Sequence, residues 1–159
     1  MKIRHGKMAD KNNFILTQIQ AFSKINVKRE IKFFMEKIKN REIFVLEQNG
    51  NYAGHISFSN CNHDPLFTDS VIIDEFAVQK KFQNRGYGTA LMKKVLERCK
   101  MKKVKIVYLS TADTKNNQAI KYYKKQGFKA VGWVKNINPN SECDHDHLIY
   151  GVLVKYWKS

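Results

Sequence analysis

The chain has 159 residues, 43% of them hydrophobic and 12% aromatic, which is typical of one folded domain and excludes a disordered chain. We therefore expect a single domain over residues 1–159. It carries 29 Lys and Arg against 14 Asp and Glu, a formal net charge of +15, which favours anionic partners or marks a lysine-rich solvated surface. No apolar run reaches the roughly 18 residues of a membrane span. The start of the chain lacks the apolar segment of a secretory signal, so we expect a cytoplasmic protein.

Cysteine usage fits a reducing compartment, because Cys61, Cys99 and Cys143 are odd in number and far apart. The nearest approach to a metal pattern is Cys143, His145 and His147, which would share one face of an extended strand. No fourth ligand is evident, so we predict a polar strand end there rather than a zinc site, and no metal.

The first third of the chain predicts a short strand at residues 2–7 and two helices. Apolar residues at helical spacing predict a helix from Asp10 to about Phe22, with Asp10 as its cap. The face expected to be buried comprises Phe14, Ile15, Gln18, Ile19 and Phe22. A second helix is predicted over 27–39.

Three strands should follow. We expect the first at 42–48 and the second at 52–59, joined by the two-residue turn Asn49-Gly50. Gly54 lies inside the second strand and indicates a bulge or a close backbone approach. After a loop at 60–69, the third strand is expected from about Ser70 to Val78.

The rest of the chain alternates helices and strands. After Gly88 we expect an amphipathic helix, then a strand at 105–110, a short helix ending at Gly127, and strands at 128–134 and 147–157. The last strand could pair across a homodimer. A hairpin sheet leading into a parallel strand–helix–strand crossover predicts an α/β fold with a mixed sheet.

One junction stands out, where the strand at 70–78 passes through a basic loop into Gly86-Tyr87-Gly88 and a helix. The first amides of a helix lack internal partners and carry partial positive charge, so this geometry binds phosphorylated ligands. Gly88-Thr89 lacks the Lys of a P-loop, and Leu91 stands where a dinucleotide-binding motif has its third glycine. A third pattern remains: Gln or Arg, two residues, Gly, one residue, then Gly or Ala. Residues 83–88 match it throughout.

With this motif the chain resembles the GNAT-type N-acetyltransferases, which bind acetyl-coenzyme A. A second block supports the resemblance, because residues 116–128 are similar to that family's Asn, Ala, aromatic-Tyr pair and Gly-Phe. The resemblance implies a GNAT-like acyltransferase fold, with a central mixed sheet flanked by helices and with fourth and fifth strands that splay apart.

The resemblance also implies how acetyl-coenzyme A is held. The backbone amides that would bind its pyrophosphate belong to Gln83, Asn84, Arg85, Gly86, Tyr87, Gly88 and Thr89. The strand edge at Phe76, Ala77 and Val78 would pair with the pantetheine arm as an added strand does. Asn116 would contact the cofactor or orient the last helix.

In the reaction that the resemblance implies, an amine attacks the thioester directly in a ternary complex. Asp74 and Glu75 are the candidate bases, and Glu75 is preferred because the family often has an acid just before this apolar stretch. Tyr123 occupies the position of the usual general acid, and a backbone amide, that of Val78, would stabilise the oxyanion.

Two other functions remain open at this point. One is a non-catalytic, regulatory module that binds coenzyme A, and the other is a basic nucleic-acid-associated protein, although no nucleic-acid motif is visible. The acceptor amine is not identified: a small amine, a peptide N-terminus and a protein lysine all fit. Acids such as Glu30 and Asp69 could attract a cationic amine, although we expect most of them to be solvated.

Overall fold

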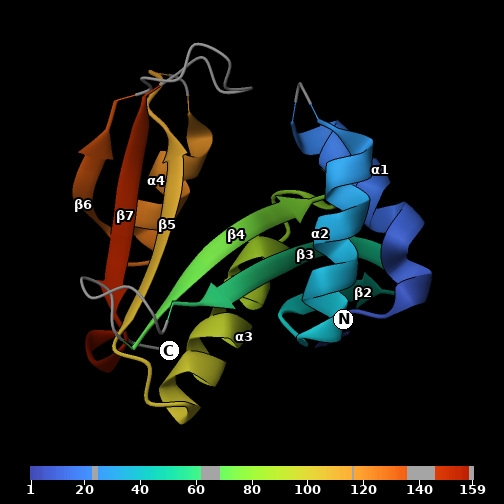
Figure 1. Cartoon of the computed structure of the whole chain (residues 1–159), viewed down its shortest axis with the longest axis horizontal. Helices are drawn as coiled ribbons and strands as arrows, with labels where there is room; N and C mark the ends of the chain where they lie inside the picture. The colour runs from blue at the N-terminus through green and yellow to red at the C-terminus, as the bar shows by residue number, and fades with distance from the viewer. Residues whose placement is uncertain (23–24, 62–68, 116, 136–145, 158–159) are drawn as a thin grey trace. The chain divides into compact units, whose positions relative to one another are not determined.

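The computed structural model describes residues 1–22, 25–61, 69–115, 117–135 and 146–157 (Figure 1). The predicted order of helices and strands is confirmed, and the boundaries expected for the second helix and the third strand of the central region agree with those observed. The elements are β1 (Lys2–His5), η1 (Met8–Asp10), α1 (Lys11–Ala21), α2 (Val27–Lys39), β2 (Ile43–Gln48), β3 (Asn51–Asn60), β4 (Ser70–Val78), η2 (Lys80–Phe82), α3 (Tyr87–Met101), β5 (Ile106–Ala112), α4 (Gln118–Lys125), β6 (Lys129–Val134), β7 (His147–Leu153) and η3 (Val154–Tyr156).

The chain divides into two compact units, each built from two segments. Unit 1 comprises Met1–Ser59 and Asp74–Val95, and unit 2 comprises Asn60–Ile73 and Leu96–Ser159. The hydrogen-bonded strand order is β1-β2-β3-β4-β5-β7-β6, and β4 is the strand that contributes to both units. Strands β4 and β5 pair in parallel. Antiparallel pairing joins β1 to β2, β2 to β3, β5 to β7 and β6 to β7. The sheet is therefore mixed, and the predicted fold class is confirmed.

The parallel ladder between β4 and β5 is short. It consists of three residue pairs, from Ser70 opposite Ile106 to Ile72 opposite Tyr108. The ladder is thus confined to the beginning of β4, and the splaying of the fourth and fifth strands stays a prediction.

In unit 1, α1 and α2 lie against one face of the β2–β3 hairpin (Figure 1). Phe14 of α1, Phe34 of α2 and Ile43 of β2 form a core with exposed fractions of 1% or less. The N-terminus of α2 is capped by Asn26, whose side chain accepts a hydrogen bond of 3.2 Å from the amide of Arg29. Burial of these rings against the sheet holds both helices in place.

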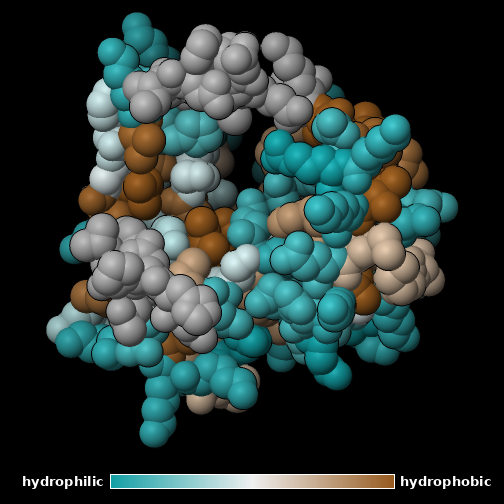
Figure 2. Space-filling model, viewed as in Figure 1, coloured by the Kyte–Doolittle hydropathy of each residue, from teal (hydrophilic) through white to brown (hydrophobic). Residues whose placement is uncertain are grey.

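The buried face of α1 differs from the expected apolar stripe. Phe14, Thr17 and Gln18 are buried, whereas Ile19 is 51% exposed and Phe22 41% exposed. Figure 2 shows apolar surface on the α1 side of unit 1, among the hydrophilic side chains of α2. The stripe prediction was wrong for Ile19 and Phe22 because polar side chains of α1 find buried polar partners in the sheet, as described below.

Asp10 is a second correction, because its side chain does not cap α1. Its carboxylate instead accepts hydrogen bonds from both terminal nitrogens of Arg4, at 2.7 and 2.8 Å, and from the amide of Lys7 at 2.7 Å. These bonds hold the pKa of Asp10 below its ordinary value although burial raises it. Asp10 therefore ties β1 to the start of α1.

The hairpin and Gly54 follow the sequence expectations. Asn49 and Gly50 have φ values of 51° and 76°, as a tight two-residue turn between antiparallel strands requires. The register between β2 and β3 shifts between Leu46 and Glu47, so β3 carries an extra residue beside Gly54. A Cβ atom on Gly54 would lie 2.6 Å from the carbonyl oxygen of Ala77, so only glycine lets β3 approach the end of β4 this closely.

In unit 2, β5 and β7 pair over seven residues and β6 lies at the outer edge. The closing strand ends at Leu153 rather than at Trp157, because a 3-10 turn begins at the buried Val154. The amide of Val154 donates a hydrogen bond to the carbonyl of Lys105. Cys61 and Cys99 carry thiols that are not in disulfides, and Cys143 lies outside the described residues. Within the described ranges, no helix combines the length and apolar character needed to cross a membrane.

Candidate functional site

The acid Asp74 on β4 is engaged in a buried ion pair. Its Oδ2 atom lies 2.7 Å from Nζ of Lys37 and accepts a hydrogen bond of 2.9 Å from the hydroxyl of Ser59. The Lys37 side chain, 4% exposed, also lies 3.3 Å from Oε2 of Glu42 and donates to the carbonyl oxygen of Phe58 at 3.1 Å. Lys37 is thus held by two carboxylates and a carbonyl oxygen, and Asp74 forms part of this ion pair.

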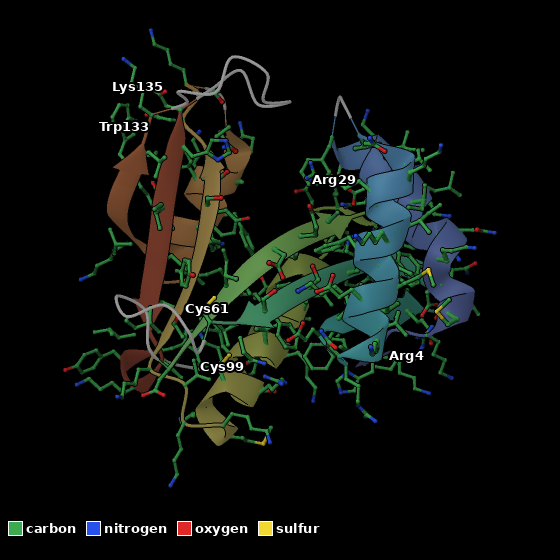
Figure 3. All side chains as sticks on the ribbon, viewed as in Figure 1. Arg4, Arg29, Cys61, Cys99, Trp133 and Lys135 are labelled. Atoms are coloured by element: carbon green, nitrogen blue, oxygen red, sulfur yellow. The ribbon has the colours of Figure 1, made fainter. Side chains whose placement is uncertain are left out.

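Glu75, the next residue, has a different environment. Its amide donates a hydrogen bond of 3.0 Å to the Ser57 hydroxyl. The pKa of Glu75 is raised from 4.5 to about 7, chiefly by burial and also by the nearby charges of Glu30 and Asp74. The Gln18 side chain and the charge of Arg29 lower the pKa of Glu75. Arg29 belongs to the first turns of α2, as the side-chain view shows (Figure 3). Glu75 is thus a carboxyl that exchanges its proton near neutral pH.

A row of buried polar side chains connects β3, α1 and α2. The hydroxyl of Tyr52 lies 2.7 Å from Nδ1 of His55, and Nε2 of His55 lies 3.2 Å from Oε1 of Gln18. The Gln18 amide nitrogen donates to Oε2 of Glu30 at 3.1 Å. Burial lowers the pKa of His55 to about 3, so its ring is neutral.

Sequence reasoning missed these four residues as part of the site. Glu30 was expected to be solvated but is only 5% exposed, and Gln18 was assigned to an apolar stripe. A signal was available, because Gln18 and His55 are polar residues in patterns that otherwise read as core. Buried polar groups need partners, and here they find one another.

The end of β4 connects to the loop through side-chain bonds. Gln83 donates from Nε2 to the carbonyl oxygen of Val78 at 3.0 Å, and Gln79 donates to the hydroxyl of Thr17 at 3.2 Å. Ala77 is buried, while Phe76 and Val78 are partly exposed. The strand end is therefore anchored to both α1 and the loop.

The loop before α3 has the geometry that anion binding needs. Asn84 and Gly86 have φ values of 59° and 78°, and the Ala90 amide bonds to the Gly86 carbonyl at 3.0 Å, so that α3 begins at Tyr87. The first turn of a helix presents its amides outward with partial positive charge. Three exposed cations, Lys80, Lys81 and Arg85, lie in the same segment. Amides and cations in this arrangement fit a diphosphate.

The predicted site residue Tyr123 is buried among aromatic rings of unit 2. Tyr123 of α4 is 8% exposed, and its ring lies 5.5 to 6.4 Å from those of Tyr122, Phe128 and Tyr150. Asn116 lies outside the described residues. Its neighbour Asn117 caps α4, accepting from the Ala119 amide at 3.0 Å while donating to the Ala112 carbonyl at 2.7 Å.

Tyr123 and Glu75 belong to different units, and their convergence on one reaction centre stays a prediction. Among the described residues, no group of three or more His, Cys, Asp and Glu side chains could hold a metal ion. Cys143 and His145, the first two residues of the zinc pattern considered above, are not described.

Comparison with known proteins gives consistent matches. The model of the acetyltransferase (GNAT) family matches residues 14–128. An N-alpha-acetyltransferase of Sulfurisphaera tokodaii is 29% identical over 153 residues, covering 87% of this chain and 91% of that protein. One from Sulfolobus acidocaldarius is 30% identical over 119 residues, covering 69% and 70%. The crystal structure of an N-acetyltransferase from Staphylococcus aureus Mu50 has a TM-score of 0.79 and 22% identity, and covers 96% of this chain and 98% of that one.

Proposed function

We propose that this chain, which belongs to the acetyltransferase (GNAT) family and is therefore an enzyme, acetylates the α-amine at the N-terminus of a peptide or protein. Because the chain belongs to a family of enzymes, we no longer consider the alternative of a non-catalytic module that binds coenzyme A. The observation that carries the choice of acceptor is the Glu75 carboxyl, whose burial raises its pKa to about 7.

A base with this pKa is matched to an α-amine and poorly matched to lysine. An α-ammonium has a reference pKa of about 7.7 to 8.0, so proton transfer to Glu75 is uphill by about one pKa unit, or about 1 kcal/mol. A lysine ammonium has a reference pKa of about 10.4, which makes the same transfer uphill by about 3.4 units, or about 5 kcal/mol. Since the amine must lose its proton before it can act as a nucleophile, Glu75 favours the α-amine by a large factor.

The names of the relatives support the same acceptor class. The relatives from Sulfurisphaera tokodaii and Sulfolobus acidocaldarius, which are 29% and 30% identical to this chain, are both N-alpha-acetyltransferases. Asp74, the alternative base, is already bound to the buried Lys37, and this supports Glu75 as the proton acceptor.

Acetyl-coenzyme A, which this family uses, fits the loop between β4 and α3. The amides of residues 83–89 would hold its pyrophosphate, and the edge of β4 at Phe76, Ala77 and Val78 would pair with its pantetheine amides. Bound there, it supplies a thioester whose carbonyl carbon the amine attacks and whose thiolate leaves. In the proposed reaction Glu75 would take the proton from the ammonium and the Val78 amide would stabilise the oxyanion. Tyr123, a residue of unit 2, stays the predicted proton donor to the leaving sulfur.

The test uses two peptides of one sequence. The first has a free N-terminus and no lysine, and the second has a blocked N-terminus and a single lysine near it. Coenzyme A release and the mass of the acetylated fragment are measured at pH 7. We expect kcat/KM for the free α-amine to exceed that for the lysine at least about 100-fold, given the difference of more than two pKa units. Equal rates, or acetylation of the lysine alone, would contradict the proposal.

A further inference from the structure

We propose that one end of unit 2 binds single-stranded nucleic acid, with lysines against its phosphates and the ring of Tyr156 against a base. The surface is built from residues 98–105, where α3 ends and β5 begins, and from Lys155 and Tyr156, which follow β7. All of these residues belong to unit 2. The inference is independent of the acetylation proposed above, because its readout is binding and not turnover.

The run at residues 98–105 is strongly basic. Its eight positions hold five cations and no acid, the cations being Arg98, Lys100, Lys102, Lys103 and Lys105. A short run of this composition is typical of patches that bind nucleic acid or heparin. The helix dipole accounts for cations in the last turn of α3, but that helix ends at Met101 and three of the lysines lie beyond it.

Backbone pairing brings a further cation to this run. Ile106 of β5 pairs with Leu153 of β7, and the Lys105 carbonyl accepts a hydrogen bond of 2.9 Å from the Val154 amide. The end of β7 therefore lies beside the beginning of β5 (Figure 1). Lys155 comes directly after this contact, so it joins the basic run although it is distant in sequence.

Two adjoining cavities lie along these cations. The larger, of about 600 Å³, is lined by four lysines together with apolar side chains, the lysines being Lys100, Lys103, Lys105 and Lys155. The smaller, of about 300 Å³, has Arg98 and Lys102 in its lining. Lys103 and Val104 line both cavities, so the cations form a row along a concave surface. A row suits the repeated phosphates of a strand better than it suits one small anion.

One carboxylate offsets part of this positive charge. Asp69 Oδ2 lies 2.7 Å from Lys105 Nζ, and the two side chains are 50% and 71% exposed. An ion pair this exposed is weak, so a phosphate group can replace the carboxylate as the partner of Lys105. The surface therefore keeps a large excess of positive charge that is accessible to a polyanion.

Tyr156 distinguishes a nucleic-acid site from a general anion site. Its ring is 67% exposed and lies 4.7 Å from Nζ of Lys155. Sites for single-stranded nucleic acid combine a basic groove along the backbone with exposed rings on which bases stack. A membrane-surface site would instead present a projecting apolar face, whereas Leu153 and Val154 here line a cavity.

The experiment measures fluorescence anisotropy of two labelled strands with the full chain. One strand has about twelve nucleotides, and the other is an abasic strand of equal length that keeps the phosphates and lacks the bases. Titrations run from about 50 to about 200 mM salt, since each phosphate contact adds about −0.7 to the slope of log affinity against log salt. We expect the strand with bases to bind more tightly than the abasic strand.

Two sets of substitutions separate a site from general charge attraction. Lys103→Gln, Lys105→Gln and Lys155→Gln together should weaken binding of both strands at least about tenfold and reduce the salt slope by about 2. The matched control removes the same charge from exposed positions of α2, with Lys28→Gln, Lys32→Gln and Lys39→Gln. This control should leave affinity within about threefold, because those lysines lie outside the row.

Tyr156→Ala tests the stacking contact. It should weaken binding of the strand with bases at least about fivefold and leave the abasic strand within about twofold, since only bases stack on a ring. Vesicles of phosphatidylserine and phosphatidylcholine, added in excess, should not displace the labelled strand.

Three results would overturn the proposal. Equal weakening by the two lysine sets would show charge attraction without a site. Equal affinity for the two strands, or a Tyr156→Ala variant that binds both as wild type does, would leave a polyanion surface that does not read bases. Displacement by the vesicles would make the surface a membrane contact. The single variant Lys103→Gln, changed at an exposed position, should already reduce the salt slope by about 0.7 and keeps the test decisive if the triple variant does not fold.

Discussion

Two carboxyls at adjacent positions of β4 have opposite environments. Asp74 lies against a buried cation, with Lys37 Nζ at 2.7 Å, and its negative charge is balanced. The pKa of Glu75 is raised to about 7, chiefly by burial and also by the charges of Glu30 and Asp74. The two residues share a strand and differ by one methylene group, yet one holds unit 1 together and the other can exchange a proton near neutral pH.

The difference shows that the partner, and not the type of acid, decides what a buried carboxyl does. Burial disfavours a charge, and for Asp74 the Lys37 cation at 2.7 Å offsets that cost. Arg29 acts on Glu75 with a smaller influence than burial. Substitutions that change one partner at a time test this difference between Asp74 and Glu75.

The largest effect is expected from exchanging the two acids for amides. Glu75→Gln should lower kcat by about 10² to 10⁴, the usual contribution of a general base. Asp74→Asn should leave kcat within about tenfold, because its loss falls on the ion pair with Lys37 rather than on proton transfer. Steady-state kinetics with a free N-terminal peptide measures both. An Asp74→Asn enzyme as slow as Glu75→Gln would reverse the two assignments.

The ion pair should dominate the stability of unit 1. Lys37→Met leaves the carboxyls of Asp74 and Glu42 without their cation, and breaking a buried pair costs about 3 to 5 kcal/mol. Urea unfolding measures the change in free energy. Lys105→Met is the control, because the Lys105 side chain is 71% exposed and its pair with Asp69 should contribute less than about 1 kcal/mol. Equal losses from the two lysine variants would show that the Lys37 pair is no stronger than a surface pair.

Glu75 should also make stability depend on pH. Its native pKa of about 7 lies above its ordinary value of 4.5, so native Glu75 keeps a proton that the unfolded chain releases between these values. The contribution of Glu75 to the free energy of unfolding is therefore fully present below pH 4.5 and is lost as the pH rises to about 7. The loss amounts to on the order of 3 kcal/mol.

His55 has the opposite sign, and for this reason wild type alone does not reveal the Glu75 contribution. The native pKa of His55, about 3, lies below its ordinary value of 6.5, so its contribution is lost as the pH falls below 6.5. The difference in unfolding free energy between wild type and Glu75→Gln, measured from pH 4.5 to 8, isolates Glu75. A difference that stays constant with pH would contradict its raised pKa.

The smallest expected effect concerns the pH dependence of turnover. If Glu75 accepts the proton, kcat should fall about tenfold for each pH unit below about 7, because only the ionised carboxylate can act as a base. Asp74→Asn should keep this limb and Glu75→Gln should lose it. A wild-type profile that is flat from pH 5 to 8 would remove Glu75 from the mechanism.

The fold was largely predictable because its signals are local. Asn49-Gly50 encodes a turn in two residues, and the apolar runs at Ser70–Val78 and Val27–Lys39 have the periods of a strand and a helix. The anion-binding loop was predictable for the same reason, since Gly86 occupies a position with a φ of 78° that other residues avoid.

The polar site was not predictable in this way. Gln18, His55 and Glu30 come from three elements, and neither the 3.6-residue period of α1 nor the alternation of β3 indicates which polar residue finds a buried partner. The buried face of α1 was therefore predicted incorrectly. Asp10 was predicted to cap a helix, whereas its carboxylate accepts hydrogen bonds from Arg4 on β1. Asn117 capping α4 was within reach of sequence reasoning, because a cap is a local feature.

The residue pattern alone thus specified the order of the elements, the turn at Asn49-Gly50 and the loop before α3, since each depends on neighbours in the chain. Folding was needed to distinguish Asp74 from Glu75. Their charges respond to Lys37, Gln18 and Glu30, which lie far away in sequence and meet β4 only when α1 and α2 cover the sheet. Desolvation and charge pairing act through space, and for that reason the proton-exchanging carboxyl of this protein is a property of its packing.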